Sequence, residues 1–166
     1  MSRAAEIAVR MGEIAVSATA GEVLVSIGLG SCIGLALVDH RRGVAGLAHV
    51  MLPEALAGGG PVGKFAELAV PELVAQLIAL GAAKPTLKAV LVGGAQMFSL
   101  GSSAAMDIGV RNDTAVREAL LRERIPVVAA QTGGSRGRTI RVVAGGPVLS
   151  KEAGGAEIEL MPGVHA

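Results

Sequence analysis

The stretch GLGSCIGLALVDHRRGVAGLAHVMLP, residues 28–53, decides the expected fold. It contains two apolar runs, at 33–38 and 44–52, which are separated by the polar residues 39–43. Two short apolar runs joined by a polar turn are typical of a β-hairpin. We therefore expect two antiparallel strands, paired side by side, in this part of the chain.

The register of this hairpin decides which side chains share a face. The loop could have two or four residues and be centred on Arg41 and Arg42. In that case the residue numbers of every facing pair in the two strands would sum to 83. Cys32 would then face Met51, and His49 would lie diagonally opposite Cys32 on the same face, where side chains about 7–8 Å apart by backbone can meet. A loop with an odd number of residues would put them on opposite faces. Contact between this thiol and this imidazole therefore depends on the register.

Cys32 is the only cysteine in the chain. The thiolate is the attacking form of cysteine, so a catalytic cysteine needs a nearby base and a backbone that lets substrate approach. Gly28 and Gly30 would give that access, and the backbone N–H groups of Gly30 and Ser31 are candidate oxyanion and substrate-binding donors. The alternative is that Cys32 is a small buried hydrophobic residue, which composition alone favours.

The candidate base is His49. The chain has two further histidines, His40 in the polar turn and His165 near the C-terminus, and such positions are more often solvated than catalytic. His49 alone lies in an apolar strand. A buried histidine is commonly a satisfied core residue, but its place on the strand next to Cys32 favours a catalytic role.

Composition limits the classes of function that the chain can serve. Its 166 residues fit one domain, so we expect a single domain spanning residues 1–166. The net charge is +1, and the chain has two Phe with no Trp or Tyr, so nothing favours a nucleic-acid partner. The sequence has no phosphate-binding loop motif and no paired Cys and His ligands, so we expect neither a cofactor nor a metal ion.

The chain also carries signals of its compartment. A single cysteine cannot form an internal disulfide, which favours a reducing compartment. The uncharged run at 23–38 is sixteen residues long and holds three glycines and two serines, so core strands explain it better than a membrane span. Charged residues interrupt the apolar ones at 1–13, so no signal peptide is expected. We therefore expect a cytoplasmic protein with no membrane insertion.

The rest of the sequence predicts a mixed domain. Apolar residues recur at helical spacing over 64–80, where Pro71 is expected to kink the helix or split it. A second helix is expected to begin with Asn112 or Asp113 as its cap. A solvated strand edge is expected for three arginines, Arg136, Arg138 and Arg141. Further strands are expected at 6–17, 21–30, 87–92, 127–130, 140–144, 148–151 and 156–160. The expected fold class is therefore α/β or α+β with layered sheets.

Six short segments follow one another along the chain: GLGSC (28–32), AHVMLP (48–53), GKFAELAV (63–70), GGAQMF (93–98), IGVRN (108–112) and TGGSRGRT (132–139). In sequence and order they resemble the signature segments of the CheD-type chemoreceptor glutamine deamidases, over about residues 10–160. The resemblance implies a β-sandwich core flanked by helices. It also implies hydrolysis of glutamine side chains on methyl-accepting chemotaxis receptors to glutamate and ammonia.

The resemblance further implies roles for individual residues. The family's nucleophile, which forms a thioester, corresponds to Cys32, and its base corresponds to His49. Its third catalytic position, a hydroxyl usually supplied by threonine, corresponds to Ser26. Serine keeps the hydroxyl but lacks the methyl group that restricts its rotamer. The helix that contains Pro71 corresponds to one that helps to dock a CheC-type phosphatase, which is a further candidate partner.

Two other functions stay open at this point. The chain could be a non-enzymatic chemotaxis regulator that binds receptors or a CheC-type phosphatase. It could also be a thiol redox sensor, in which Cys32 would oxidise reversibly without a second cysteine to resolve the sulfenic acid. Only a deamidase would change the mass of receptor glutamines.

Overall fold

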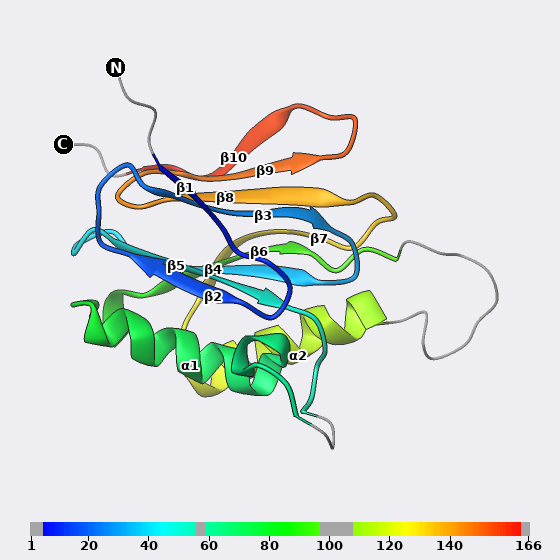
Figure 1. Cartoon of the computed structure of the whole chain (residues 1–166), viewed down its shortest axis with the longest axis horizontal. Helices are drawn as coiled ribbons and strands as arrows, with labels where there is room; N and C mark the ends of the chain where they lie inside the picture. Colours follow the sequence, from blue (N-terminus) through cyan, green and yellow to red (C-terminus); the bar gives the residue numbers. More distant parts are fainter. Residues whose placement is uncertain (1–4, 56–58, 97–107, 164–166) are drawn as a thin grey trace.

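The computed structural model describes residues 5–55, 59–96 and 108–163. It has two five-stranded sheets and two α-helices, stacked in layers (Figure 1). The prediction of a mixed α/β fold with a sandwich core flanked by helices is confirmed. None of the helices in the described ranges combines the length and the apolar character needed to cross a membrane.

The first sheet has the strand order β1-β3-β8-β9-β10, and the second has the order β2-β5-β4-β6-β7. The strands of the first sheet are β1 (Glu6–Ala8), β3 (Val23–Leu29), β8 (Arg138–Val143), β9 (Val148–Glu152) and β10 (Glu157–Met161). Those of the second sheet are β2 (Ile14–Ser17), β5 (Val44–Val50), β4 (Ile33–Asp39), β6 (Lys88–Gly93) and β7 (Val127–Thr132). The expected hairpins β4–β5 and β8–β9 are both present.

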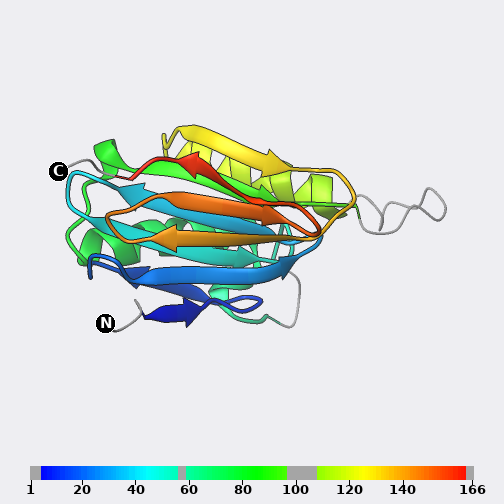
Figure 2. The same cartoon turned by 90° about the horizontal axis from the view of Figure 1, so that it is seen from above.

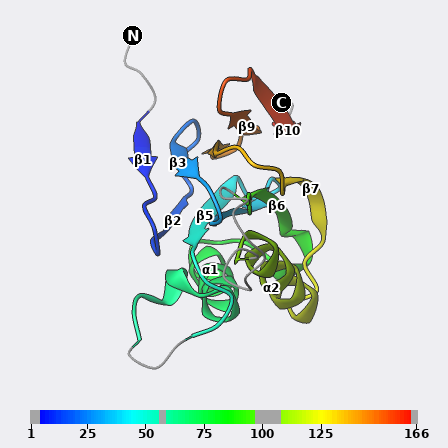
Figure 3. The same ribbon diagram turned by 90° about the vertical axis from the view of Figure 1, so that its right-hand side faces the viewer.

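Both α-helices lie against the second sheet. They are α1 (Ala66–Ala79) and α2 (Ile108–Arg122), and the short 3₁₀ turns η1 (Val62–Lys64) and η2 (Lys84–Thr86) flank α1. Figure 2 shows the strands of the first sheet in front with the helices behind them, and Figure 3 shows the layers end on. The outer face of the first sheet therefore has no helix over it in the described part of the chain.

Two apolar layers hold the three layers of structure together. One lies between the helices and the second sheet, and it includes Leu35 and Leu37 of β4. The other lies between the two sheets, and it includes Ala36 and Val38 of the same strand. Strands β4 and β5 are buried at every position because each face contacts one of these layers. This explains why the sequence of the hairpin is apolar throughout rather than alternating.

Of the two alternatives expected at Pro71, a kink or a split, the split of the helix is wrong. Helix α1 runs through Pro71, and its buried side chains Val70 and Leu73 belong to the same apolar cluster. A proline inside a helix removes one hydrogen bond and crowds the preceding turn. Packing of one continuous apolar face on both sides of the proline outweighs that cost, so the helix persists.

Two further expectations need correction. Residues 6–17 form two strands in different sheets, because the chain turns between Arg10 and Glu13 and crosses from the first sheet to the second. The second helix begins at Ile108 in the described residues, so Asn112 and Asp113 lie within α2 and do not cap it. The side chains of Val116, Ala119 and Leu120 are buried in the apolar layer between the helices and the second sheet.

The three arginines that were expected at a solvated strand edge do not share one environment. Arg138 is buried, whereas Arg136 is exposed and Arg141 is partly buried. The period of the strand explains this, because Arg138 shares a face with the buried residues Ile140 and Val142 of β8. Its guanidinium donates to the carbonyl oxygens of Gly93 and Gly133, at 3.2 Å and 2.7 Å. The loop segment GGAQMF ends outside the described residues.

Candidate active site

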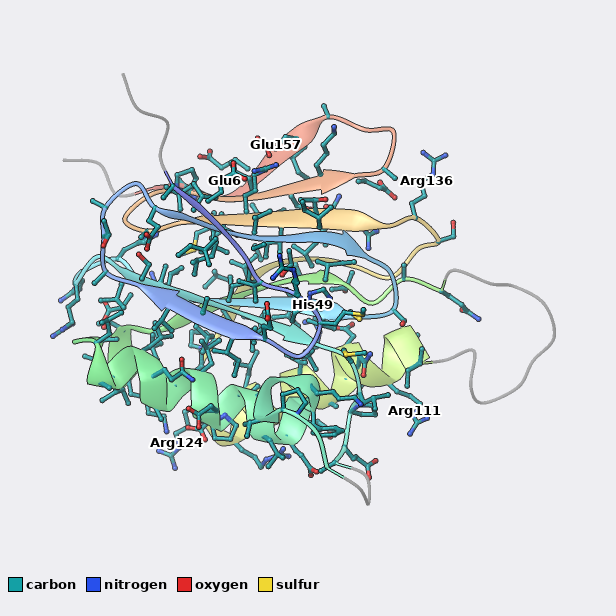
Figure 4. The ribbon with its side chains drawn as sticks, viewed as in Figure 1. Glu6, His49, Arg111, Arg124, Arg136 and Glu157 are labelled. Atoms are coloured by element: carbon teal, nitrogen blue, oxygen red, sulfur yellow. The ribbon has the colours of Figure 1, made fainter. Side chains whose placement is uncertain are left out.

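The β4–β5 register is that of the even-loop alternative, although the expected facing pair of Cys32 and Met51 lies beyond the last pair of the ladder, Ile33 with Val50. Gly34 pairs with His49, so facing residue numbers sum to 83, and the loop contains the four residues 40–43. Cys32 directly precedes Ile33, the first residue of β4, and it packs against the apolar layer between the sheets. His49 faces the same layer with Leu47 and is 4% exposed. The register places both side chains on one face, in the space between the sheets where Figure 4 shows His49.

Gly34 keeps this part of the sandwich closed. A Cβ atom on Gly34 would lie 2.8 Å from Ile140 Cγ2 and 2.9 Å from Leu29 Cδ1, both in the first sheet. Any side chain there would push the first sheet away from the second. Because Gly34 is directly opposite His49, the close approach of the two sheets occurs beside the imidazole.

A backbone carbonyl fixes the tautomer of His49. His49 Nδ1 lies 3.0 Å from the carbonyl oxygen of Val9, the residue that follows β1. A carbonyl oxygen only accepts, so Nδ1 carries the proton in this contact, and Nε2 of the neutral ring has a free lone pair. That is the tautomer that a general base needs.

Ser26 reaches the same carbonyl. Its Oγ donates to the Val9 oxygen at 2.7 Å, and the side chain is 1% exposed. The hydroxyl therefore acts on the acceptor of the histidine rather than on the imidazole itself. The sequence offered no signal for Val9, because a backbone carbonyl can come from any residue.

Burial shifts both candidate catalytic groups toward their neutral forms. Burial lowers the pKa of His49 below its usual value, against the opposing effects of the Val9 hydrogen bond and the charge of Glu13. Burial raises the pKa of the half-buried Cys32 thiol. Both shifts favour the uncharged forms at neutral pH, a thiol for Cys32 and a neutral imidazole for His49.

The loop before β4 turns its carbonyl groups away from the site. The carbonyl oxygens of Gly30, Ser31 and Cys32 accept from Ala95 N, Asn112 Nδ2 and Gly94 N, at 2.8 Å, 2.9 Å and 2.8 Å. Within residues 5–55, 59–96 and 108–163, no group accepts a hydrogen bond from the N–H groups of residues 30–32. These N–H groups are therefore without a hydrogen-bond acceptor in the described part of the chain.

Gly93 makes this arrangement possible. A Cβ atom on Gly93 would lie 2.2 Å from the carbonyl oxygen of Cys32, and its φ of 116° lies in the region that favours glycine. Because residue 93 has no side chain, the backbone of residues 93–95 can lie directly against the loop that contains Cys32.

A cavity of about 340 Å³ opens beside His49. Its walls are formed by Ala8, Val9, Arg10, Met11, Val25, Ile27 and His49. Met11 and Ile27 are 62% and 69% exposed, so the walls present apolar surface to an incoming chain. Ile27 also lines a second cavity of about 670 Å³ on the outer face of the first sheet.

The second cavity has charged walls. Arg141 contacts Glu6 at 2.9 Å and Glu157 at 3.5 Å. Figure 4 shows both carboxylates near the outer face of the first sheet. The described residues contain no cluster of three or more His, Cys, Asp or Glu side chains that could bind a metal ion.

Comparison with known proteins agrees with the resemblance seen in the six segments. A family model described as CheD chemotactic sensory transduction matches residues 51–152. A probable chemoreceptor glutamine deamidase CheD of Symbiobacterium thermophilum is 44% identical over 158 residues, which cover 92% of this chain and 96% of that protein. A protein of the same name from Geobacillus kaustophilus is 43% identical over 164 residues, which cover 96% of this chain and 99% of that protein.

A third such protein, from Clostridium botulinum strain Alaska E43, is 40% identical over 159 residues, covering 93% of this chain and 98% of its own length. The segment matched by the family model begins after Cys32 and His49, so that match assigns no role to either residue. The matches span most of the described fold and both of its sheets. The chain therefore belongs to the CheD family.

Proposed function

We propose that this protein hydrolyses glutamine side-chain amides on methyl-accepting chemotaxis receptors, giving glutamate and ammonia, with Cys32 as nucleophile. The observation that carries the proposal is that the register puts His49 on the same face of the sheet as Cys32, with His49 Nδ1 hydrogen-bonded to the Val9 carbonyl. The names of the relatives, probable chemoreceptor glutamine deamidases, support the choice of substrate.

The first half of the reaction forms a thioester. His49 Nε2 accepts the proton of the Cys32 thiol as Sγ attacks the amide carbon of the glutamine. The amide oxygen becomes an oxyanion, which the N–H groups of Gly30 and Ser31 stabilise. The imidazolium then gives its proton to the amide nitrogen, the C–N bond breaks, and ammonia leaves.

The second half hydrolyses the thioester. His49 Nε2 takes a proton from water, and the resulting hydroxide attacks the thioester carbon. The C–S bond breaks, the imidazolium returns its proton to sulfur, and the receptor carries glutamate. The Val9 carbonyl accepts from Nδ1 throughout, and it stabilises the positive ring whenever Nε2 is protonated.

Substrate recognition in this proposal uses the apolar rim beside His49. Met11 and Ile27 are exposed at the mouth of the cavity, and they can contact the aliphatic side chains that flank a receptor glutamine. The reaction needs no redox step and no group transfer from a cofactor. A cytoplasmic location belongs to the proposal, because a free thiol is maintained in a reducing compartment.

The deciding experiment incubates the full-length protein with the cytoplasmic part of a chemoreceptor and follows receptor peptides by mass spectrometry. Conversion of specific glutamines to glutamate, lost in Cys32→Ala, is the expected result. Conversion that continues at the original rate in Cys32→Ala would falsify the assignment of the nucleophile. Binding of receptor with no conversion by the unaltered protein would instead favour the non-enzymatic regulator.

A CheC-type phosphatase is a further proposed partner, by family resemblance. The continuity of α1 through Pro71 supports it, because the helix expected to dock the phosphatase is intact and exposes Leu68 and Ile78. Titration of purified CheC-type phosphatase with this protein and with Leu68→Asp tests the contact. Equal affinity for the two forms contradicts docking through this face of α1.

A further inference from the structure

The two strands that carry the candidate catalytic residues separate next to those residues, so that His49 lies just inside the paired region and Cys32 just outside it. At the end of the hairpin away from the loop, the ladder stops at the pair of Ile33, where β4 begins, and Val50, where β5 ends. Beyond them, the Cys32 carbonyl accepts from Gly94 N, and Met51 N donates to a carbonyl of η1, both at 2.8 Å. The sheet ladder therefore ends one residue before the thiol, and it does not fix the distance between the ends of the two strands.

One side chain bridges the separated ends. Asn112 of α2 is fully buried, and its Nδ2 donates to the Ser31 carbonyl at 2.9 Å and to the Met51 carbonyl at 2.8 Å. Ser31 precedes the candidate nucleophile, and Met51 lies two residues after the candidate base. Both amide hydrogens of Asn112 are therefore used to join the strand that carries Cys32 to the strand that carries His49.

The chemistry of the amide suits this bridge. Two carbonyl oxygens that face one another across the gap need two donors, and a neutral amide nitrogen supplies both from a single atom. An aspartate of the same shape has no donor when ionised and would place a negative oxygen against two carbonyls. An apolar side chain would leave both carbonyls without a partner.

We infer that Asn112 is a positioning residue for catalysis: it holds the Cys32 loop against the end of β5, and so sets the separation of thiol and imidazole. The same bridge turns the Ser31 carbonyl away from substrate and leaves the neighbouring N–H groups directed to it. The inference rests on the proposed function for its kinetic part only, since the environment of the Cys32 thiol can be measured without a substrate.

The test compares Asn112→Asp and the smaller Asn112→Ser with two controls. Leu120→Ala removes a fully buried side chain from the same helix, two turns farther from the bridge, and serves as the control for lost stability. Asp113→Asn changes a charge in the same helical turn, where the carboxylate pairs with Arg117 at 2.8 Å. Circular dichroism gives each melting temperature, and all assays run well below the lowest one.

Two readouts are used. The first is kcat and KM for receptor deamidation, where we expect kcat to fall roughly 10- to 100-fold in both Asn112 variants with KM little changed. The second is the rate of Cys32 alkylation by iodoacetamide against pH, which reports on one site because the chain has a single cysteine. We expect its midpoint to move toward that of His49→Ala in the Asn112 variants and to stay unchanged in both controls.

The outcomes separate this inference from the proposed function. If the unaltered protein never deamidates receptors but the alkylation midpoint moves in the Asn112 variants alone, the positioning role stands and the proposed function fails. If folded Asn112 variants keep the original alkylation profile, the inference is overturned. The same holds if Leu120→Ala moves that profile as far as they do, since loss of stability then explains the effect.

Discussion

Ser26 and His49 donate to one oxygen atom. Ser26 Oγ and His49 Nδ1 lie 2.7 Å and 3.0 Å from the carbonyl oxygen of Val9, although the two side chains belong to different sheets. Ser26 and Val9 come from the first sheet and its edge, and His49 comes from the second. The tautomer of the candidate base therefore depends on the packing of one sheet against the other.

Replacing Ser26 tests this shared acceptor. Ser26→Ala leaves the Val9 carbonyl bound to His49 but free to shift, so we expect kcat to fall by about fivefold, the equivalent of one hydrogen bond of about 1 kcal/mol. Ser26→Thr keeps the hydroxyl, and we expect it to retain activity. Steady-state deamidation kinetics measure both, and equal rates for Ser26→Ala and the original protein would show that the hydroxyl does not matter.

His49→Ala removes the candidate base. We expect kcat/KM to fall by about 10²- to 10⁴-fold, the usual contribution of general acid–base transfer. The matched control is His40→Ala, because His40 lies in the loop after β4 and its ring is hydrogen-bonded to the Gly146 carbonyl, at 3.2 Å. A comparable loss of activity in the two variants would argue against a specific role for His49.

The pH dependence of activity follows from burial of the same histidine. Catalysis needs neutral His49, and burial lowers the pKa of this histidine. As the pH is lowered, kcat/KM should therefore stay at its neutral-pH value past the usual histidine pKa of about 6.5, and it should decrease only at a lower pH. A pH–rate profile between mildly acidic and mildly alkaline conditions measures this limb. A midpoint above the usual histidine value contradicts the assignment.

The same shift makes stability depend on pH. The folded-state pKa of His49 is lower than in the unfolded chain, so the unfolded chain binds the proton first as pH falls. The free energy of unfolding should therefore decrease as pH falls through the usual histidine pKa of about 6.5 toward the lowered value. Urea denaturation of the original protein and of His49→Asn gives the difference, and parallel curves for the two would contradict it.

Gly34→Ala tests the close approach of the sheets. The added methyl would lie under 3 Å from Ile140 and Leu29, so we expect a loss of about 1–3 kcal/mol in the free energy of unfolding, together with lower activity. Gly137→Ala is the control, since its added methyl would have only an ordinary contact of 3.6 Å with the Leu29 carbonyl. Chemical denaturation should separate the two variants clearly, and similar losses would show that the position opposite His49 is not special.

The central part of the fold could be predicted from the sequence because it depends on local pattern. The sequence limited the hairpin to two alternatives, a loop of even length or one of odd length, and the four-residue loop in the structure selects the one that places Cys32 and His49 on one face. The burial of Arg138 was also readable, since its strand alternates and Ile140 and Val142 share its face. The burial of Arg138 was missed because cationic side chains are usually expected to be solvated.

The remaining parts depend on contacts between distant segments. Val9 is 17 residues from Ser26 and 40 residues from His49, and it acts through its backbone, so its side chain carries no signal. Asn112 looked like a helix cap because asparagine favours that position, but its amide faces two strands from elsewhere in the chain. Such contacts become visible only when the sheets and helices are assembled.

The neutral state of the Cys32 thiol has a consequence for survival of the protein under oxidative stress. Peroxides react with thiolates far more readily than with thiols, so burial that raises the pKa of Cys32 slows its conversion to sulfenic acid. This disfavours a peroxide-sensing role, for which a low pKa and open access are required. In the proposed reaction Cys32 is deprotonated only as it attacks the substrate, so between turnovers it stays in the less reactive thiol form.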